Sequence, residues 1–109
     1  MSTLRRADRL TIFVDETDHV RHQPLYAEIV HRARKAGLAG ATALRGVEGF
    51  GASTVLHARH AYGLAEPLPI QIVIVDSTER IDAFLPVLDA LVQEGLVVRQ
   101  PVEILDRRP

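Results

Sequence analysis

The chain has 109 residues, of which 47% are hydrophobic and 25% are charged, and its formal net charge is −1 at pH 7. A chain of this length fits a single domain around one hydrophobic core. It contains no cysteine, which excludes disulfide frameworks, thiolate metal sites and cysteine nucleophiles. The near-neutral charge argues against non-specific binding to nucleic acid, which usually needs a basic face.

No apolar run approaches the ~18 residues that a membrane-spanning helix requires. No apolar segment as long as the central region of a signal peptide follows the charged residues 1–9, so no signal peptide is evident. We therefore expect a cytoplasmic protein that is not itself inserted in a membrane. We expect residues 1–109 to form one domain with a core over about residues 9–105 and frayed tails at both ends.

The first half of the chain predicts a strand, a helix and a second strand. Residues 10–14 are β-branched or aromatic, which favours a strand. Pro24 stands where a helix can begin, and Gly37 is a natural residue to end it. The apolar positions between them recur at helical spacing: Leu25, Ile29, Ala33 and Ala36. Residues 41–47 are small and β-compatible and predict the second strand.

The second half predicts the same sequence of elements. Residues 70–75 form a nearly continuous apolar run, which indicates a central strand with much of both faces covered. Asp76 is placed as the N-cap of the following helix, and Gly95 as its end. The helical stripe consists of Ile81, Phe84, Leu85, Leu88, Leu91 and Val92. Residues 96–105 predict the last strand, in which Pro101 marks a bulge or a sheet edge.

The two halves resemble each other, which indicates a duplicated strand–helix–strand unit. Residues 14–18 (VDETD) are echoed by residues 75–79 (VDSTE). Two such units interleaved in one antiparallel sheet predict an α+β fold, a ferredoxin-like βαββαβ sandwich with a long loop between the second and third strands. Both helices would cover one face of the sheet. Because several strand positions are apolar on both faces, we infer that the second face is buried in an oligomer.

The long loop over residues 46–69 carries a cluster of glycines. A loop of more than ~15 residues in so small a domain is usually functional, disordered or the site of a local element. Gly46, Gly49 and Gly51 permit close approach of the backbone, so that successive N–H groups could bind an anion. A bulged strand end followed by a turn explains these glycines equally well.

The histidines suggest a metal site as one interpretation. His19 and His22 are three positions apart, as are His57 and His60, and imidazole is a common metal ligand. Neither pair falls in a predicted helix and no third ligand is evident, so histidines exposed to solvent in loops are the alternative.

The sequence gives little support to catalysis. Asp15, Glu16 and Asp18 suit acid–base chemistry or magnesium binding, but their counterparts in the second half suggest helix capping. Ser53 with His57 forms a nucleophile–base pair without an acid to orient it. We therefore expect no enzyme activity.

At this point a family resemblance is evident. The segments 24–26, 37–53, 68–69, 75–76 and 84–88 resemble the PII-like family called domain of unknown function 190. The resemblance extends over about residues 10–105 and implies a ferredoxin-like subunit assembled as a homotrimer. Members are often associated with CrcB-type fluoride channels, so the resemblance implies a membrane channel or transporter as partner. No settled activity comes with the family.

The wider PII superfamily binds adenine nucleotides in clefts between subunits and docks on its partners through its long loop. By this resemblance Thr42 lies near an adenine, and Gly49, Phe50 and Gly51 lie near phosphate. Arg45, Arg59 and Arg99 are the available cations. Two features of PII are missing. Ala52 stands where PII places a basic or amide residue, and the glycine- and lysine-rich loop that PII has before its last strand is absent, since Gly95 passes straight into Leu96. A monophosphate or another small anion therefore suits the site better than a triphosphate.

Two functions follow as expectations. The first is a trimeric, non-enzymatic regulator that binds a small effector, with an adenine nucleotide as the candidate, through Thr42, Arg45, Gly49, Phe50 and Gly51. The alternative is a metal-binding trimer that resembles the copper-tolerance proteins of the same superfamily and uses His57 and His60 with His19 and His22.

Overall fold

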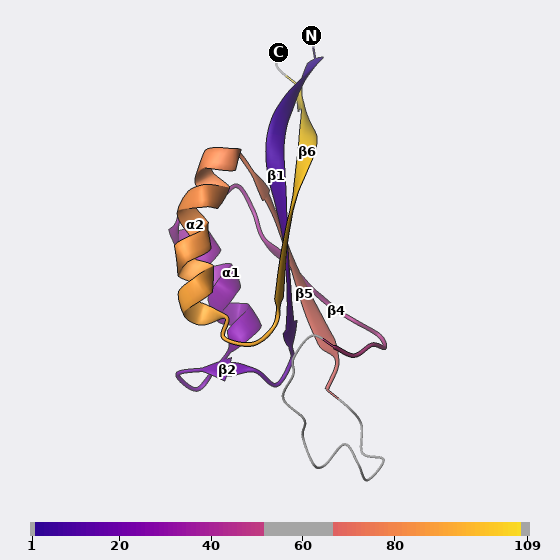
Figure 1. The fold of residues 1–109 in the computed structure, drawn as a ribbon, viewed down its shortest axis with the longest axis vertical. Coiled ribbons are helices and arrows are strands. Elements are labelled where there is room, and N and C mark those ends of the chain that lie inside the picture. The colour runs from indigo at the N-terminus through magenta and orange to yellow at the C-terminus, as the bar shows by residue number, and fades with distance from the viewer. Residues whose placement is uncertain (1, 52–66, 108–109) are drawn as a thin grey trace.

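Four strands form one antiparallel sheet in the computed structural model, which describes residues 2–51 and 67–107 (Figure 1). The order across the sheet is β4-β5-β1-β6, with bounds β1 (Ser2–Asp15), β4 (Thr42–Arg45), β5 (Pro69–Asp76) and β6 (Leu96–Arg107). Helix α1 (Leu25–Lys35) follows β1, and helix α2 (Thr78–Leu91) follows β5. The predicted ferredoxin-like βαββαβ fold is confirmed. A short hairpin of β2 (His19–Val20) and β3 (Gln23–Pro24), which was not predicted, precedes α1.

The core lies between the sheet and the two helices. Buried and half-buried residues alternate along β5, because successive side chains of a strand point to opposite faces. The predicted central position of this strand, with much of both faces covered, is confirmed, although the side chains of its second face are only half-buried in the subunit. The buried residues of the core come from both layers: Leu10, Ile12, Val14, Leu25, Ile29, Ala33, Ile70, Ile72, Ile74, Ile81, Phe84 and Leu88.

Glycine ends helix α1 as the sequence predicts. Gly37 has φ +81°, and its N–H donates to the carbonyl of Arg34 at 3.1 Å. The N–H of Leu38 donates to the carbonyl of Ala33, also at 3.1 Å. This pair of bonds satisfies two carbonyls at the helix end, and the left-handed residue that it requires is one that glycine adopts without strain.

The ends of helix α2 differ from the prediction at both termini. Ser77 is the N-cap, and its hydroxyl accepts from the N–H of Arg80. Asp76 is instead the last residue of β5, and its carboxylate accepts from the N–H groups of Ala39 and Ser77. The helix ends at Leu91, before the predicted Gly95, because Val92 already has an extended backbone.

The predicted frayed tails are instead paired strands. Ser2 lies opposite Arg107 and Leu4 opposite Leu105, and this register continues without interruption to Phe13 and Leu96. Residues 2–7 and 102–107 are ordered because each strand supplies the other with hydrogen-bonding partners. Pro101 lies in β6 at the edge of the sheet, where the proline's missing N–H is tolerated.

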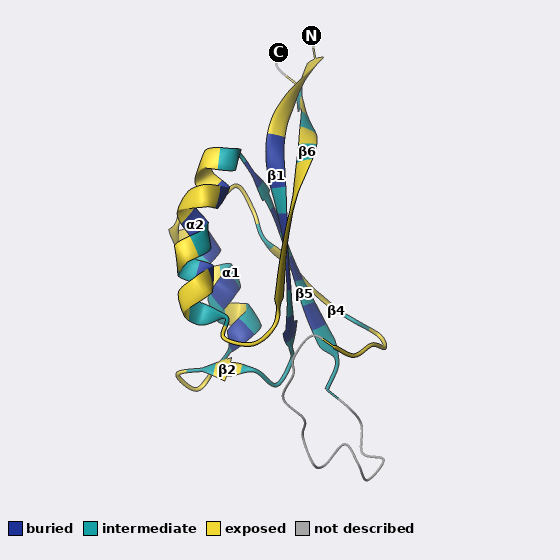
Figure 2. Ribbon diagram, in the orientation of Figure 1, coloured by how far each residue is buried: buried dark blue, intermediate teal, exposed yellow. Residues whose placement is uncertain are grey.

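The face of the sheet turned away from the helices is apolar and uncovered in the subunit. The residues opposite each other in the register share a face, so Phe13 and Leu96 lie on the same side as Val73 and Thr11. Leu44 on β4 and Val98 on β6 extend this apolar surface to both sheet edges, and both are exposed. Both helices lie on the opposite side of the sheet (Figure 2). The expected open face is present.

Replacement of Gly95 by alanine tests the close contact between β1 and the turn before β6. A Cβ atom at Gly95 would lie 2.6 Å from the carbonyl oxygen of Phe13, at a φ of +142°. We expect Gly95→Ala to lower the free energy of unfolding by about 2 kcal/mol or more, measured by urea denaturation. Gly40→Ala is the matched control, because a Cβ there meets nothing within 4 Å, and should change stability by less than about 0.5 kcal/mol. If the two substitutions lowered the free energy of unfolding equally, the close contact between Gly95 and Phe13 would be contradicted.

Candidate functional site

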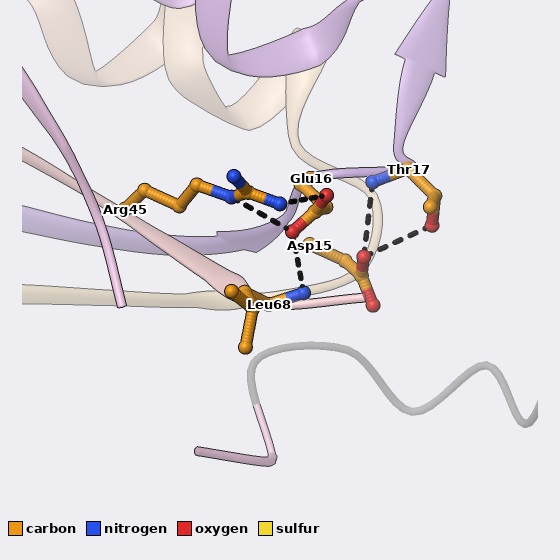
Figure 3. A network of polar contacts seen from close by, with 5 residues as sticks. All are labelled: Asp15, Glu16, Thr17, Arg45 and Leu68. Atoms are coloured by element: carbon orange, nitrogen blue, oxygen red, sulfur yellow. Dashed lines mark hydrogen bonds and ion pairs between the residues drawn. The ribbon is translucent and has the colours of Figure 1, made fainter. Parts of the chain in front are cut away.

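One carboxylate joins the two ends of the long connection between β4 and β5. Glu16 follows directly after β1, and its Oε1 and Oε2 atoms accept from Nη2 and Nε of Arg45 at 2.9 and 3.1 Å (Figure 3). The Oε2 atom also accepts from the N–H of Leu68 at 2.6 Å, and the N–H of Glu16 donates to the carbonyl of Leu68 at 3.1 Å. Glu16 therefore contacts the residue at the end of β4 and the residue that precedes β5.

The neighbouring carboxylates shape the turn that presents Glu16. The Oδ1 atom of Asp15 accepts from both the N–H and the hydroxyl of Thr17, at 3.0 and 2.9 Å (Figure 3). The carboxylate of Asp18 accepts from the N–H of Asp15 at 2.9 Å. Such local bonds are typical of Asp in turns. They give Asp15 and Asp18 a structural role within the turn, but neither caps a helix as the sequence suggested, since Pro24 is the N-cap of α1 and no side chain caps that helix.

The glycine segment begins beside the same contact. The N–H of Gly46 donates to the carbonyl of Pro69 at 2.8 Å, and a Cβ atom at Gly46 would lie 2.9 Å from the Pro69 ring. Gly51 has φ +97°, a conformation that favours glycine. Between them, Val47 and Phe50 are 94% and 97% exposed, so their apolar side chains extend into solvent.

The predicted ligand residues Thr42 and Arg45 lie on opposite faces of β4. Thr42 is opposite Val73, on the uncovered face, whereas Arg45 is opposite Ile70, on the face that the helices cover. Both side chains are exposed because β4 is an edge strand. A ligand that contacts both has to cross this edge of the sheet. Gly49, Phe50 and Gly51 follow on the same chain beyond β4.

Arg99, a candidate phosphate ligand in the sequence, is engaged in ion pairs. Its Nε atom donates to Asp8 at 2.6 Å, its Nη1 atom lies 2.8 Å from a carboxylate oxygen of Asp82, and Nη2 donates to the carbonyl of Thr78. Hydrogen bonds to Asp8 and then Asp82 raise the pKa of Arg99. These contacts tie β6 to β1 and to the first turns of α2, which gives Arg99 a structural role.

The metal hypothesis finds no support in the described residues. His57 and His60, like Arg59, lie outside them. Within residues 2–51 and 67–107, no group of three or more His, Asp and Glu side chains could hold a metal ion. The Nδ1 atom of His19 lies within hydrogen-bonding distance of the carbonyl of Thr17, and His22 has φ +69° between β2 and β3.

The role of Glu16 was not predicted, although the internal repeat contains a signal for it. Glu16 occupies the position that Ser77, the N-cap of α2, has in the second half. In the first half the hairpin of β2 and β3 separates this position from α1, so the side chain caps no helix. It is thereby available to contact Arg45, which is 29 positions away in the sequence.

The fold is similar to that of solved PII-like proteins. The nitrogen regulatory PII-like protein CPII from Thiomonas intermedia, solved with ADP, AMP and bicarbonate, superimposes with a TM-score of 0.63 and 16% identity, covering 98% of this chain and 99% of that chain. A putative PII-like signaling protein from Thermus thermophilus gives a TM-score of 0.58 at 16% identity, covering 94% of this chain and 91% of that chain.

The family is shown by sequence. The model of the DUF190 family, described as "Uncharacterized ACR, COG1993", matches residues 7–104, and the chain belongs to this family. A UPF0166 protein from Aquifex aeolicus is 30% identical over 96 residues, which cover 88% of this chain and 90% of that protein. A UPF0166 protein from Methanocaldococcus jannaschii is 30% identical over 94 residues, which cover 85% and 86%. The recognised resemblance to this family is confirmed.

In the described part of the chain, neither helix has the length and apolar character that crossing a membrane requires.

Hydrogen exchange tests whether Glu16 holds the start of β5. Replacing Glu16 by alanine removes the acceptor of the Leu68 N–H, so we expect that amide to exchange about tenfold faster or more, measured by NMR. Glu48→Ala is the control, because Glu48 is an exposed carboxylate of the glycine segment. An unchanged exchange rate at Leu68 in Glu16→Ala would contradict the proposed contact.

Proposed function

We propose that this protein is a homotrimeric, non-enzymatic signalling protein that binds a small phosphate-bearing effector, with an adenine nucleotide as first candidate. The effector controls the segment over residues 46–69, which contacts a partner protein. The observation that carries this proposal is the contact of Glu16 with both Arg45 and Leu68. Because Glu16 contacts both Arg45 and Leu68, a ligand that binds Arg45 changes the contacts at both ends of that segment.

Competition for Arg45 supplies the physical coupling. A guanidinium group forms paired hydrogen bonds equally well with a carboxylate and with a phosphate. An anion that binds the guanidinium group of Arg45 therefore displaces the carboxylate of Glu16. Glu16 then no longer pairs with Arg45 and keeps only its contacts with Leu68. Because a ligand shifts an equilibrium only by its difference in affinity for two states, the effector favours the state in which Arg45 has left Glu16.

The glycine segment supplies the remaining anion-binding groups. Gly49 and Gly51 lie a few residues beyond Arg45, and the absence of side chains lets a ligand approach their N–H groups closely. Thr42, on the uncovered face of the same strand, is assigned to the other end of the ligand. Since Arg99 is engaged by Asp8 and Asp82, a monophosphate or a similarly small anion is a better match than a triphosphate.

The trimer is supported by the uncovered face of the sheet. Phe13, Val73, Leu96 and Val98 lie on this face, and two of them are largely exposed although they are apolar. A sheet face with several exposed apolar side chains is typical of an interface between subunits. A closed threefold arrangement brings Thr42, at the sheet edge, to the seam between two copies.

The partner is assigned from the exposed apolar side chains of the glycine segment. Val47 and Phe50 are almost fully exposed, and large apolar side chains so placed are characteristic of recognition surfaces. We propose a membrane channel or transporter as the partner, reached from its cytoplasmic side, and fluoride is therefore included among the effectors to be tested.

Calorimetric titration tests the effector site. The panel consists of AMP, ADP, ATP, inorganic phosphate and fluoride. Among them we expect an adenine nucleotide to bind. Arg45→Ala should weaken that binding by about 10- to 100-fold, because it removes charged hydrogen bonds to the phosphate. Arg34→Ala is the matched control, since Arg34 is an exposed arginine in the last turn of α1.

A second variant tests whether the effector competes with Glu16 for Arg45 or is only attracted by the positive charge of Arg45. Glu16→Gln removes the charge that holds Arg45, so it should strengthen binding of the same nucleotide while Arg45→Ala weakens it. Weaker binding in Glu16→Gln would contradict the competition, and a folded protein that binds no member of the panel would overturn the effector proposal.

A further inference from the structure

The far ends of β1 and β6 form a ribbon that leaves the rest of the fold. Strand β5 pairs with β1 only from Asp8 onward, where Asp8 lies opposite Asp76. Residues 2–7 of β1 therefore pair only with residues 102–107 of β6, and this ribbon extends past the first turn of α2 (Figure 1). An isolated two-stranded ribbon is at best marginally stable in water. A ribbon of this length is therefore expected to gain stability from contact with another molecule.

One side of the ribbon carries an apolar pair between charges. Leu4 and Leu105 lie directly opposite each other and are 62% and 56% exposed. Because side chains alternate along a strand, Arg6 and Arg107 lie on the same side, and Glu103 lies there opposite Arg6. This side of the ribbon therefore presents two leucines with a net positive charge.

A groove that also combines apolar and charged side chains lies along α2, between this helix and β6. It has a volume of about 540 Å³, and apolar side chains of α2, the segment after it and β6 line it: Leu85, Pro86, Leu88, Val92 and Val97. Asp82 and Asp89 border it, and because Asp82 is paired with Arg99 at 2.8 Å, Asp89 supplies the negative charge at this border. In the ribbon two leucines are flanked by arginines, and in the groove an apolar strip is flanked by aspartates.

We propose that the ribbon of one copy docks in the α2 groove of the next copy, with Leu4 and Leu105 against Leu85 and Val97. Every copy carries both a ribbon and a groove, so the ribbon of each copy can dock in the groove of the next. This head-to-tail contact gives a closed ring when the rotation between neighbouring copies brings the last copy back to the first. The charges favour this occupant, since the net positive side of the ribbon then faces Asp89, while Asp82 stays paired with Arg99 of its own chain. The proposal rests on the proposed homotrimer and adds a second contact to the one made by the uncovered sheet face.

Disulfide formation between separate copies tests this contact, since the natural chain has no cysteine. Leu105→Cys and Leu85→Cys are placed in separate chains, which are mixed, allowed to exchange and mildly oxidised. A disulfide forms only where two Cα atoms come within about 7 Å. We expect a covalent dimer as the major product. Ala90→Cys replaces Leu85→Cys in the control, because Ala90 is exposed on α2 beside a different cavity.

Further measurements keep the result decisive. Leu4→Cys with Leu85→Cys repeats the test from the other strand of the ribbon, and circular dichroism shows that each variant is folded. An equal yield with Ala90→Cys, or no covalent dimer while light scattering still gives an assembled protein, would overturn the docking of the ribbon. In that second case nucleotide binding at Arg45 and the trimer itself would stand, so the two proposals fail separately.

Discussion

The uncovered face of the sheet is the constraint on which the rest of the molecule depends. Two helices of 11 and 14 residues cover one side of four strands, and the other side is apolar from Leu44 at one edge to Val98 at the other. A subunit built in this way leaves apolar side chains such as Leu44 and Leu96 exposed on the open face. The proposed assembly follows from this imbalance, because association of copies removes the apolar surface from water.

The candidate site owes its position to the same duplicated architecture. Both halves turn sharply after a central strand, and the residue at the same place in each turn is Ser77 in one half and Glu16 in the other. Ser77 caps a helix, as a short hydroxyl side chain does well. Glu16, with a hairpin inserted before its helix, reaches Arg45 and Leu68 instead. One position in a repeated unit thus serves stability in one half and connects the ends of a long segment in the other.

Much of the fold could be predicted from the sequence because its signals are local. The apolar run over 70–75, the helical spacing after Pro24 and the glycine at position 37 are each signals that act within a few residues. The pairing of Ser2 with Arg107 could not be predicted in the same way. Residues 2–6 have no strand pattern of their own, and their order comes from a partner strand at the other end of the chain.

The site was predicted less completely for a related reason. The resemblance indicated a segment that includes Arg45, but the contact between Glu16 and Arg45 depends on how β1 and β4 are spaced by β5 between them. The arrangement of Thr42 and Arg45 on opposite faces could have been read from their odd separation along a strand, since side chains alternate. That Arg99 is held by Asp8 and Asp82 depends on three elements and is visible only in the structure.

The molar mass in solution tests the central claim, that the apolar face is covered by other copies of the chain. Light scattering on protein eluting from a size-exclusion column at micromolar concentration measures it directly. We predict a mass three times the 12.1 kDa of one chain. A mass of one chain, with the circular dichroism of a folded protein, would contradict the account.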